Sequence, residues 1–293
     1  MAEGRIIKAL SGFYYVADGE NTIQCRGRGN FRKRKITPLV GDIVEYEAEN
    51  MTDGYVLEVY ERKNALIRPP IANVDQAILV FSIKEPDLNL QLLDKFLVHI
   101  EANDIEPLIC FSKYDLADET LKHQVDEIVK QYEQVGYTVL LTSTIEEEGI
   151  KKIRPFLTNN ISVVAGQSGV GKSSLLNALE PSLHIETNNI SMHLGRGKHT
   201  TRHVELLQIE GGLVADTPGF SSLDFHNIEA EDLTYCFPEM RALINDCKFR
   251  GCTHTQEPKC AVREAVEGEK ISSSRYKHYV EFLQEIKSQK RRY

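Results

Sequence analysis

The chain has 293 residues, a formal net charge of −8 and 41% hydrophobic residues, which is enough for two or three packed domains. Its apolar runs are short, as at residues 77–81, so a membrane span is excluded, and an N-terminus without a hydrophobic signal segment predicts a cytoplasmic protein. Six cysteines in a chain of this length do not indicate a disulfide framework, and the acidic balance by itself argues against a nucleic-acid partner.

Residues 1–68 contain five short stretches of strand-forming residues, separated by turn signals such as Gly12 and Asp53-Gly54. The expected strands lie at residues 5–10, 13–16, 22–26, 42–48 and 55–60. This pattern is typical of an OB-type β-barrel, a fold that often binds oligonucleotides.

A basic stretch follows the third of these strands. Residues 26–35 carry six positive charges, two glycines and one aromatic side chain. We interpret the stretch as a flexible arm whose cations neutralise RNA phosphates while Phe31 stacks on a base; the alternative is a solvated loop without a ligand. The candidate RNA-binding residues are Arg26, Arg28, Phe31, Arg32, Lys33, Arg34 and Lys35.

Strands and helices alternate through residues 69–225, beyond a stiff linker at Pro69-Pro70. Strands are expected at residues 76–83, 107–111, 137–142, 161–165 and 212–215, and helices at 88–102, at 119–134 and from 174 onward. Such alternation is typical of a parallel sheet with helices on both faces.

The strand at residues 161–165 runs into the sequence GQSGVGKS, which matches the phosphate-loop pattern GxxxxGK[ST]. Glycines allow consecutive N–H groups to point at phosphate oxygens, and the following helix presents its N-terminus to them. Lys172 supplies positive charge to the β- and γ-phosphates, and the Ser173 hydroxyl is a predicted Mg²⁺ ligand. The predicted nucleotide contacts are Gly166, Gln167, Ser168, Gly169, Val170, Gly171, Lys172, Ser173 and Ser174.

Two further motifs predict that the nucleotide is GTP. The sequence Ser112-Lys113-Tyr114-Asp115 resembles the [NT]KxD element, in which the carboxylate accepts hydrogen bonds from guanine N1–H and the 2-amino group. Adenine offers no such pair of donors, and a carboxylate left unpaired by the wrong base is costly. Thr142 and Ser143 end the next strand and resemble the backbone element that contacts the guanine oxygen.

The sequence Asp216-Thr217-Pro218-Gly219 matches DxxG, in which the aspartate holds the Mg²⁺ shell and the glycine N–H reaches the γ-phosphate. In Ras-like GTPases the guanine-reading motifs follow the phosphate loop, whereas here they precede it. The motif order is therefore circularly permuted. A consequence is that the segment after Gly219 leads straight into the C-terminal region, where we expect nucleotide state to be coupled to RNA contact.

The glycine-rich basic run at residues 194–203 is the expected first switch. Thr201 is the first choice, and Thr200 the second, for the threonine whose hydroxyl binds Mg²⁺. Phe220 stands where Ras-type GTPases place a water-orienting glutamine, so slow intrinsic hydrolysis is expected. His199 is a candidate to orient or deprotonate the water, with a merely solvated histidine as the alternative. The predicted catalytic residues are His199, Thr201 and Lys172, and the predicted Mg²⁺ ligands are Ser173, Thr201 and Asp216.

The last motif has the pattern Cys-x₄-Cys-x-His-x₅-Cys. Its members are Cys247, Cys252, His254 and Cys260. Three thiolates and one imidazole match a closed tetrahedral Zn²⁺ site, which leaves no position for an activated water and predicts a structural role. Residues 226–293 are too few for a self-sufficient core, and after Cys260 they are predicted to be helical.

Together, the permuted order, the run Gly195-Arg-Gly-Lys-His-Thr-Thr201, the sequence Asp216-Thr-Pro-Gly-Phe220 and the Cys/Cys/His/Cys group resemble the ribosome small-subunit-dependent GTPase A family. The resemblance covers nearly the whole chain. It implies an OB-type barrel at residues 1–68, a circularly permuted α/β P-loop GTPase domain at 69–225 and a mainly helical zinc-binding domain at 226–293.

The resemblance also implies a function. The chain would bind the small ribosomal subunit and its rRNA during late maturation, and the subunit would stimulate hydrolysis of GTP to GDP and phosphate. One structural Zn²⁺, and Mg²⁺ with GTP, are the implied cofactors; we expect a monomer and no membrane partner. Ser112 stands where the family usually has asparagine, which predicts weaker guanine affinity without a change to ATP.

Two other classes of protein are alternatives. A P-loop kinase for a small molecule explains the phosphate loop, but neither DxxG nor the element at Ser112 to Asp115. A zinc-containing RNA-binding module with a vestigial nucleotide site is the second, and the intact Lys172, Ser173 and Asp216 argue against it.

Overall fold

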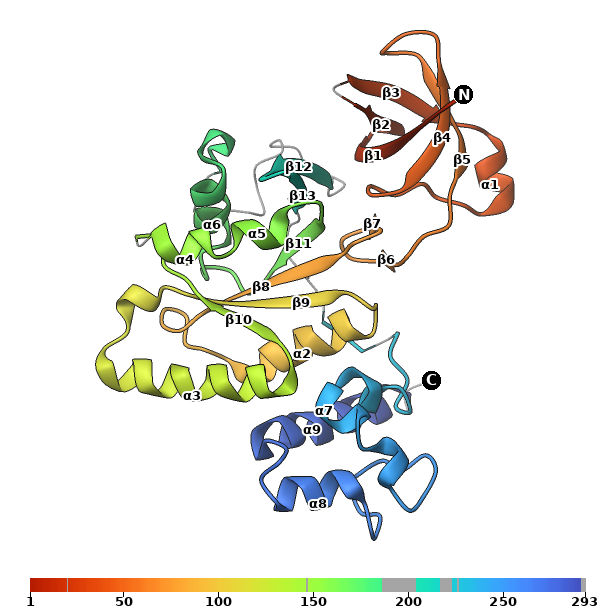
Figure 1. Cartoon of the computed structure of the whole chain (residues 1–293). Helices are drawn as coiled ribbons and strands as arrows, with labels where there is room; N and C mark the ends of the chain where they lie inside the picture. The colour runs from red at the N-terminus through yellow and green to blue at the C-terminus, as the bar shows by residue number, and fades with distance from the viewer. Residues whose placement is uncertain (20, 146, 186–203, 217–222, 226, 291–293) are drawn as a thin grey trace.

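The computed structural model describes every residue except 20, 146, 186–203, 217–222, 226 and 291–293. Three bodies follow one another along the chain, as Figure 1 shows: an N-terminal barrel, a central sheet flanked by helices, and a C-terminal group of helices. The multi-domain architecture expected from the sequence is thereby confirmed. None of the helices within the described residues is long and apolar enough to cross a bilayer.

The N-terminal barrel is built from five strands. They are β1 (Ala2–Leu10), β2 (Phe13–Asp18), β3 (Asn21–Gly27), β4 (Ile43–Ala48) and β5 (Gly54–Val59). β1 pairs with both β2 and β4 in antiparallel register, and β3 pairs with β5 in parallel register, which closes the barrel. Inward side chains such as Ile6, Val16 and Val44 are fully buried, as the alternation of a half-buried strand requires. The expected OB-type barrel is confirmed.

The basic stretch after β3 departs from the expected flexible arm. It contains the short helix α1 (Asn30–Arg34). Phe31 on this helix is only 4% exposed and packs in the barrel core. The structure therefore corrects the interpretation of Phe31 as a base-stacking residue, because an aromatic ring enclosed by the core has no free face for a base.

The linker between the barrel and the central sheet is folded against the barrel. It forms a hairpin of β6 (Ala65–Leu66) and β7 (Ile71–Ala72). Arg62 donates from Nε and Nη2 to the two carboxylate oxygens of buried Asp42, at 2.7 and 2.8 Å. Gly41, at φ +93°, is so close to Ala72 that a Cβ would lie 2.0 Å from its carbonyl oxygen. The predicted domain limit between residues 68 and 69 falls inside this hairpin and stays a prediction.

The central sheet holds the five strands that were expected from the sequence and a sixth, β12, that was not expected. They are β8 (Gln76–Ser82), β9 (Glu106–Ser112), β10 (Thr138–Leu141), β11 (Ile161–Ala165), β12 (Glu205–Ile209) and β13 (Gly212–Asp216). β10, β9, β8, β11 and β13 lie side by side in that order and run parallel, and antiparallel β12 follows β13. β12 in turn pairs with β1, so that one eleven-stranded sheet continues from the central domain into the barrel.

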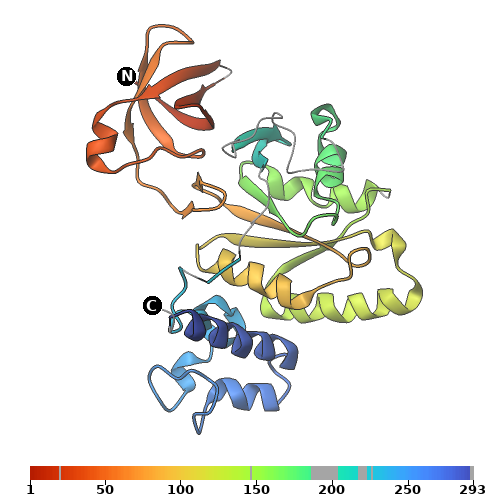
Figure 2. The same cartoon turned by 180° about the vertical axis from the view of Figure 1, so that it is seen from behind.

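Helices cover both faces of the central sheet, as Figures 1 and 2 show. α2 (Leu90–Glu101) and α3 (Glu119–Val135) lie on one face, and α4 (Glu147–Lys151), α5 (Arg154–Leu157) and α6 (Lys172–Leu179) on the other. Alternate residues of β8 face the two layers: Leu79 and Phe81 pack with α2, whereas Ile78 and Val80 pack with α5 and α6. Every residue of β8 is consequently buried, as a covered parallel sheet requires.

The C-terminal region is mainly helical and packs on α2. Its elements are η3 (Leu233–Cys236), α7 (Pro238–Arg241), η4 (Ile244–Asp246), α8 (Ala261–Glu267) and α9 (Ser273–Lys290). Its apolar core includes Phe237, Tyr279 and Phe282 and extends to Val98 of α2. The core is thus shared with the central domain rather than self-sufficient.

A buried ionic cluster joins the C-terminal helices to the central domain. Arg275 of α9 is 1% exposed and pairs with Asp94 of α2, which is fully buried, and with Glu239 of α7 at 2.5 Å. Asp94 also accepts a hydrogen bond from Tyr132 of α3 at 2.9 Å and contacts Nδ1 of His278 at 2.6 Å. Because displacement of either helix would leave a charge unpaired in the interior, the cluster fixes one arrangement of the two domains.

Candidate functional site

The phosphate loop has the strand–turn–helix setting that its motif requires. Residues 166–171 connect the end of β11 to the N-terminus of α6. Gly166, Gly169 and Gly171 have φ of 141°, 81° and 96°, a conformation that side chains with a Cβ rarely adopt. At Gly166 a Cβ would also lie 2.1 Å from the carbonyl oxygen of Val80 on β8. The glycines of the motif therefore allow the loop to turn directly above the end of the neighbouring strand.

Lys172 and Ser173 begin α6 with their side chains buried against the loop. Nζ of Lys172 donates to the carbonyl oxygens of Gly166, at 2.8 Å, and of Gln167. Burial lowers the pKa of Lys172 to about 8. The buried Oγ of Ser173 has no hydrogen-bond partner among the residues that the structure describes. An unsatisfied hydroxyl at this position fits the predicted role of Ser173 as a Mg²⁺ ligand, because a buried polar group needs a partner.

The two guanine-reading motifs meet in space although they are far apart in the sequence. Lys113, at φ 59°, turns the chain from β9 into the short helix η1 (Tyr114–Leu116), which carries Asp115. Ser143, just beyond β10, donates from Oγ to Oδ1 of Asp115 at 2.5 Å. The backbone N–H of Tyr114 donates to the carbonyl oxygen of Thr142 at 3.2 Å. These contacts fix the Asp115 carboxylate at the carboxyl edge of the sheet, on the same edge as the phosphate loop.

Ser112 connects the guanine-reading strand to the phosphate loop. Its Oγ donates to the carbonyl oxygen of Val170 at 2.6 Å, and the residue is buried. Lys113 extends the same framework, since its Nζ donates to the carbonyl oxygen of Glu85 in the loop after β8. The expectation for Ser112 concerned only an amide lost near the base, and sequence reasoning missed this tie. The hydroxyl positions the loop that holds the phosphates.

Several predicted site residues lie outside the described residues. These are His199, Thr200, Thr201, Gly219 and Phe220. Asp216 is the last residue of β13, whose Ala215 pairs with Val163 on β11. The DxxG motif therefore leaves the sheet beside the strand that enters the phosphate loop, and the roles assigned to its side chains and to the first switch stay predictions.

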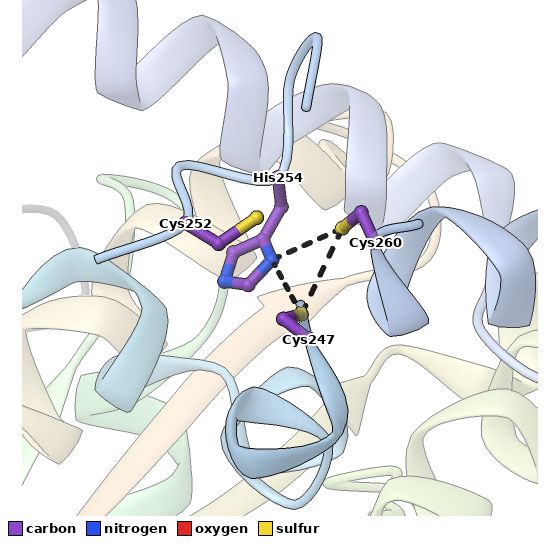
Figure 3. A group of neighbouring side chains, drawn as sticks. All are labelled: Cys247, Cys252, His254 and Cys260. Atoms are coloured by element: carbon purple, nitrogen blue, oxygen red, sulfur yellow. Dashed lines mark hydrogen bonds between the residues drawn. The ribbon is translucent and has the colours of Figure 1, made fainter. Parts of the chain in front are cut away.

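The four residues of the cysteine–histidine motif converge in the C-terminal domain (Figure 3). One ligand atom from each of Cys247, Cys252, His254 and Cys260 lies within 4.8 Å of all the others. Nδ1 of His254 lies 3.6 Å from Sγ of Cys247 and 3.3 Å from Sγ of Cys260, and these two sulfurs are 3.9 Å apart. Ligands about 2.0–2.3 Å from a tetrahedral ion are separated by about 3.5–3.8 Å, so the group could hold a metal ion.

Hydrogen bonds from α9, and others within the loop itself, hold the loop that carries His254. The hydroxyl of Tyr276 donates to the carbonyl oxygen of His254 at 2.7 Å, and that of Tyr279 to the carbonyl oxygen of Thr253 at 3.0 Å. Glu257 accepts from the Thr253 hydroxyl and N–H, both at 2.7 Å. Support of this kind orients ligands in metal sites.

Of the candidate RNA-binding residues, Phe31 is buried, whereas the cations Arg26, Arg28, Lys33, Arg34 and Lys35 are exposed. Arg28 pairs with Glu47 at 2.9 Å and Arg34 with Glu58 at 3.1 Å, so two of the cations are partly neutralised within the barrel.

Sequence reasoning missed one exposed aromatic residue. Phe249, beside Cys247, is 43% exposed, and Nζ of Lys248 lies 5.3 Å from its ring centroid. An aromatic ring flanked by cations is the signal that could have identified it.

The phosphate-loop motif after β11 and the guanine-reading motifs after β9 and β10 lie at one edge of the sheet and together define the class of protein. The strand order of the sheet is that of a P-loop GTPase, and the sequence order of its strands is circularly permuted. The family model described as RsgA GTPase matches residues 59–226, and the model of the RsgA N-terminal domain matches residues 3–56. The chain belongs to the RsgA GTPase family and is a GTP hydrolase.

Relatives of known name match the chain over its whole length. The small ribosomal subunit biogenesis GTPases RsgA of Shouchella clausii and of Bacillus cereus are each 64% identical over 293 residues, covering 100% of both chains. Among solved structures, YloQ, described as a circularly permuted GTPase, superposes with a TM-score of 0.85 at 53% identity, over 99% of this chain and 96% of its own. YjeQ from Thermotoga maritima superposes with a TM-score of 0.86 at 39% identity, over 97% and 98%.

A change at Ser112 tests whether its hydroxyl positions the phosphate loop. Ser112→Ala removes the donor to the Val170 carbonyl oxygen. We expect GDP to bind about three- to tenfold more weakly, because a hydrogen bond contributes about 0.5–1.5 kcal/mol. Titration with a fluorescent GDP analogue measures the affinity, and Ser112→Thr, which keeps the hydroxyl, is the matched control. Equal affinity of the alanine variant and the unchanged protein would contradict this role.

Proposed function

We propose that this GTPase acts in the late maturation of the small ribosomal subunit, which binds it and stimulates its hydrolysis of GTP to GDP and phosphate. The names of full-length relatives at 64% identity support this role. The observation that carries GTP as the nucleotide is the Asp115 carboxylate, held by Ser143 beside the phosphate loop. Because subunits assemble in the cytoplasm, we place the protein there, as a monomer without a membrane partner.

The proposed nucleotide contacts begin at the phosphate loop. Lys172 would exchange its hydrogen bonds to the loop carbonyls for the β- and γ-phosphates, whose charge would offset the effect of burial on its pKa. Mg²⁺ neutralises charge on the phosphates, and Ser173, Asp216 and Thr201 would hold it. The backbone N–H groups of residues 166–174 would surround the phosphate oxygens.

Hydrolysis also requires a residue that positions the attacking water. Phe220 has no group that can do so. We assign this role to His199, whose ring can orient the water or take its proton. His199 belongs to residues 186–203, which connect the phosphate-loop helix to β12 in the sequence. Contact with the subunit would bring His199 into place, and hydrolysis without the subunit would be slow.

The metal held by Cys247, Cys252, His254 and Cys260 is proposed to be Zn²⁺. Three thiolates and one imidazole at tetrahedral spacing favour this ion over oxygen-preferring cations. All four positions are taken by protein, so the ion would link two loops and stabilise the fold. It would take no part in hydrolysis.

The proposed RNA contacts combine two surfaces. The first is the basic stretch, with Arg26, Arg28, Arg32, Lys33, Arg34 and Lys35 as phosphate-binding candidates. The second is the exposed Phe249 with Lys248, next to the metal cluster. Phe249 replaces Phe31 as the candidate for stacking on a base.

The hydrolysis rate with and without purified small subunits tests the proposed function. We expect the subunits to raise the rate, since a partner is needed to order the water-positioning residue. His199→Ala is expected to bind GTP and subunits normally but to lose most of the stimulated step in single-turnover assays. No increase with subunits would contradict the proposed function, and an unchanged step in the variant would exclude His199.

Asp115→Asn tests guanine recognition. The substitution replaces one acceptor by a donor, and xanthine carries a carbonyl where guanine carries the 2-amino group. We expect GTP affinity to fall by about a hundredfold or more, and xanthosine triphosphate to bind instead. Competition binding measures both, with Asp118→Asn, which keeps the cap of α3, as the control. Retained GTP affinity, or equal binding of ATP, would favour the kinase alternative.

Elemental analysis after dialysis tests the metal. We expect one zinc per chain, and loss of that zinc in Cys252→Ser because a hydroxyl is a poor ligand for this ion. Cys236→Ser is the matched control, since Cys236 is buried in the same domain but lies outside the cluster. A native chain without stoichiometric zinc would refute the assignment.

A further inference from the structure

Strand β12 has a partner on each side, and both meet it at the same residue. Glu205 pairs with Lys8 of β1 in the barrel and with Asp216 of β13 in the central domain. One row of paired residues therefore crosses three strands, from the barrel to the aspartate of the DxxG motif. The row therefore joins the barrel, which carries the proposed RNA contacts of the basic stretch, to the central domain, which carries the GTPase motifs.

The row lies at the end of the hairpin to which both predicted nucleotide-sensing segments are attached. Residues 186–203, which contain the predicted first switch, lead almost directly into Glu205, and the DxxG motif leaves β13 at Asp216. β12 and β13 form a hairpin that is closed at Glu210 and Gly211 and open at Glu205 and Asp216. Both predicted nucleotide-sensing segments are thus attached to the open end of one hairpin.

β1 reaches this hairpin with one edge, while its other edge stays paired with β2 of the barrel from Arg5 to Leu10. Its residues Ala2 to Arg5 pair with β4 and close the barrel, whereas Lys8 pairs with β12. A register shift in the β1–β2 pairing falls between Ile6 and Lys8, where the opposite edge of β1 passes from β4 to β12. Without β1, β12 would be the unpaired edge of the central sheet, and edge strands are readily displaced.

The ladder between β1 and β12 is short, and its ion pair is partly exposed. Within the described residues, the β1–β12 ladder has one register pair, Lys8 with Glu205, and the Nζ of Lys8 lies 2.9 Å from Oε2 of Glu205, with side chains 29% and 34% exposed. A partly exposed ion pair of this kind is worth little on its own and can be made or broken at small cost. By contrast, the barrel is held to its linker by the bidentate Arg62–Asp42 pair.

We propose that the β1–β12 junction transmits contact between the barrel and its partner to the open end of the β12–β13 hairpin, with Lys8 and Glu205 as positioning residues for stimulated hydrolysis. This inference rests on the proposed function, because the partner is the small subunit. Docking of the barrel would hold β1 against β12 and so fix the ends of both nucleotide-sensing segments. Neither side chain touches the nucleotide; they act through the strand pairing.

The test compares Lys8→Ala, Glu205→Ala and the exchanged pair Lys8→Glu with Glu205→Lys. We expect intrinsic hydrolysis and subunit affinity to be unchanged, and the rate at saturating subunits to fall about threefold in each single variant, the size that a partly exposed ion pair allows. The exchanged pair and Lys8→Arg should restore the rate. Lys63→Ala, which breaks the exposed Lys63–Asp75 pair of the linker, is the matched control and should behave as the unchanged protein.

The outcomes separate this inference from the proposed function. If the unchanged protein is not stimulated by subunits, the proposed function fails. If it is stimulated and both single variants are stimulated equally, the inference is overturned. It is also overturned if the variants only weaken subunit binding and reach the full rate at saturation, or if the exchanged pair does not restore the rate. Thermal unfolding by circular dichroism identifies a variant that has lost its fold, in which case Glu205→Gln, which keeps the size of the side chain, replaces Glu205→Ala.

Discussion

The close approach of the phosphate loop to the end of β8 is the constraint on which the site depends. Gly166 lies where a Cβ would meet the Val80 carbonyl oxygen at 2.1 Å, so the loop rests directly on the neighbouring strand. On its other side the loop is tied to β9 by the Ser112 hydroxyl, 2.6 Å from the Val170 carbonyl oxygen. Because β9 also leads to Asp115, these two contacts set the distance between the phosphate site and the base site. That distance is a property of the sheet and does not depend on the order in which the chain visits its strands.

Circular permutation is tolerated for this reason, and its effect is on the connections. The barrel and its linker enter the central domain at β8, and the chain leaves it from β13 toward the C-terminal helices. In this order the strands that carry the guanine-reading motifs precede the phosphate loop in the chain, while the last hairpin is attached to both segments that are predicted to sense the γ-phosphate. The barrel therefore contacts β12, and the C-terminal domain follows β13, which ends at the DxxG motif.

Local patterns in the sequence predicted the elements of the fold well, and contacts between distant residues account for what they missed. The glycine spacing of the phosphate loop, the turn signals between the barrel strands and the alternation of strands with helices are local signals, and the elements that they predicted are present in the structure. Phe31 was misread because an aromatic residue among cations resembles an RNA-binding arm, whereas its burial depends on the barrel closing around it. The bond from Ser112 to Val170 and the pair of Lys8 with Glu205 join residues far apart in the chain, and no local pattern encodes them. The same holds for Asp94, which reads as an ordinary helix residue until Arg275 is placed beside it.

The two appended domains contact the nucleotide-proximal elements of the central domain through different kinds of interaction, and this difference indicates the direction of coupling. The C-terminal domain is fixed by the buried Arg275–Asp94 pair. It is also fixed by Phe225, whose ring lies 5.2 Å from that of Phe282 and 4.5 Å from Nζ of Lys95. Phe225 comes shortly after the DxxG motif, so the chain that follows this motif leads to an anchored residue. A buried charge cluster resists small displacements because each would leave an ion unpaired, whereas the partly exposed contact at Glu205 can change at little cost. The physical asymmetry therefore favours the barrel, rather than the metal-binding domain, as the part of the molecule whose position the nucleotide site senses.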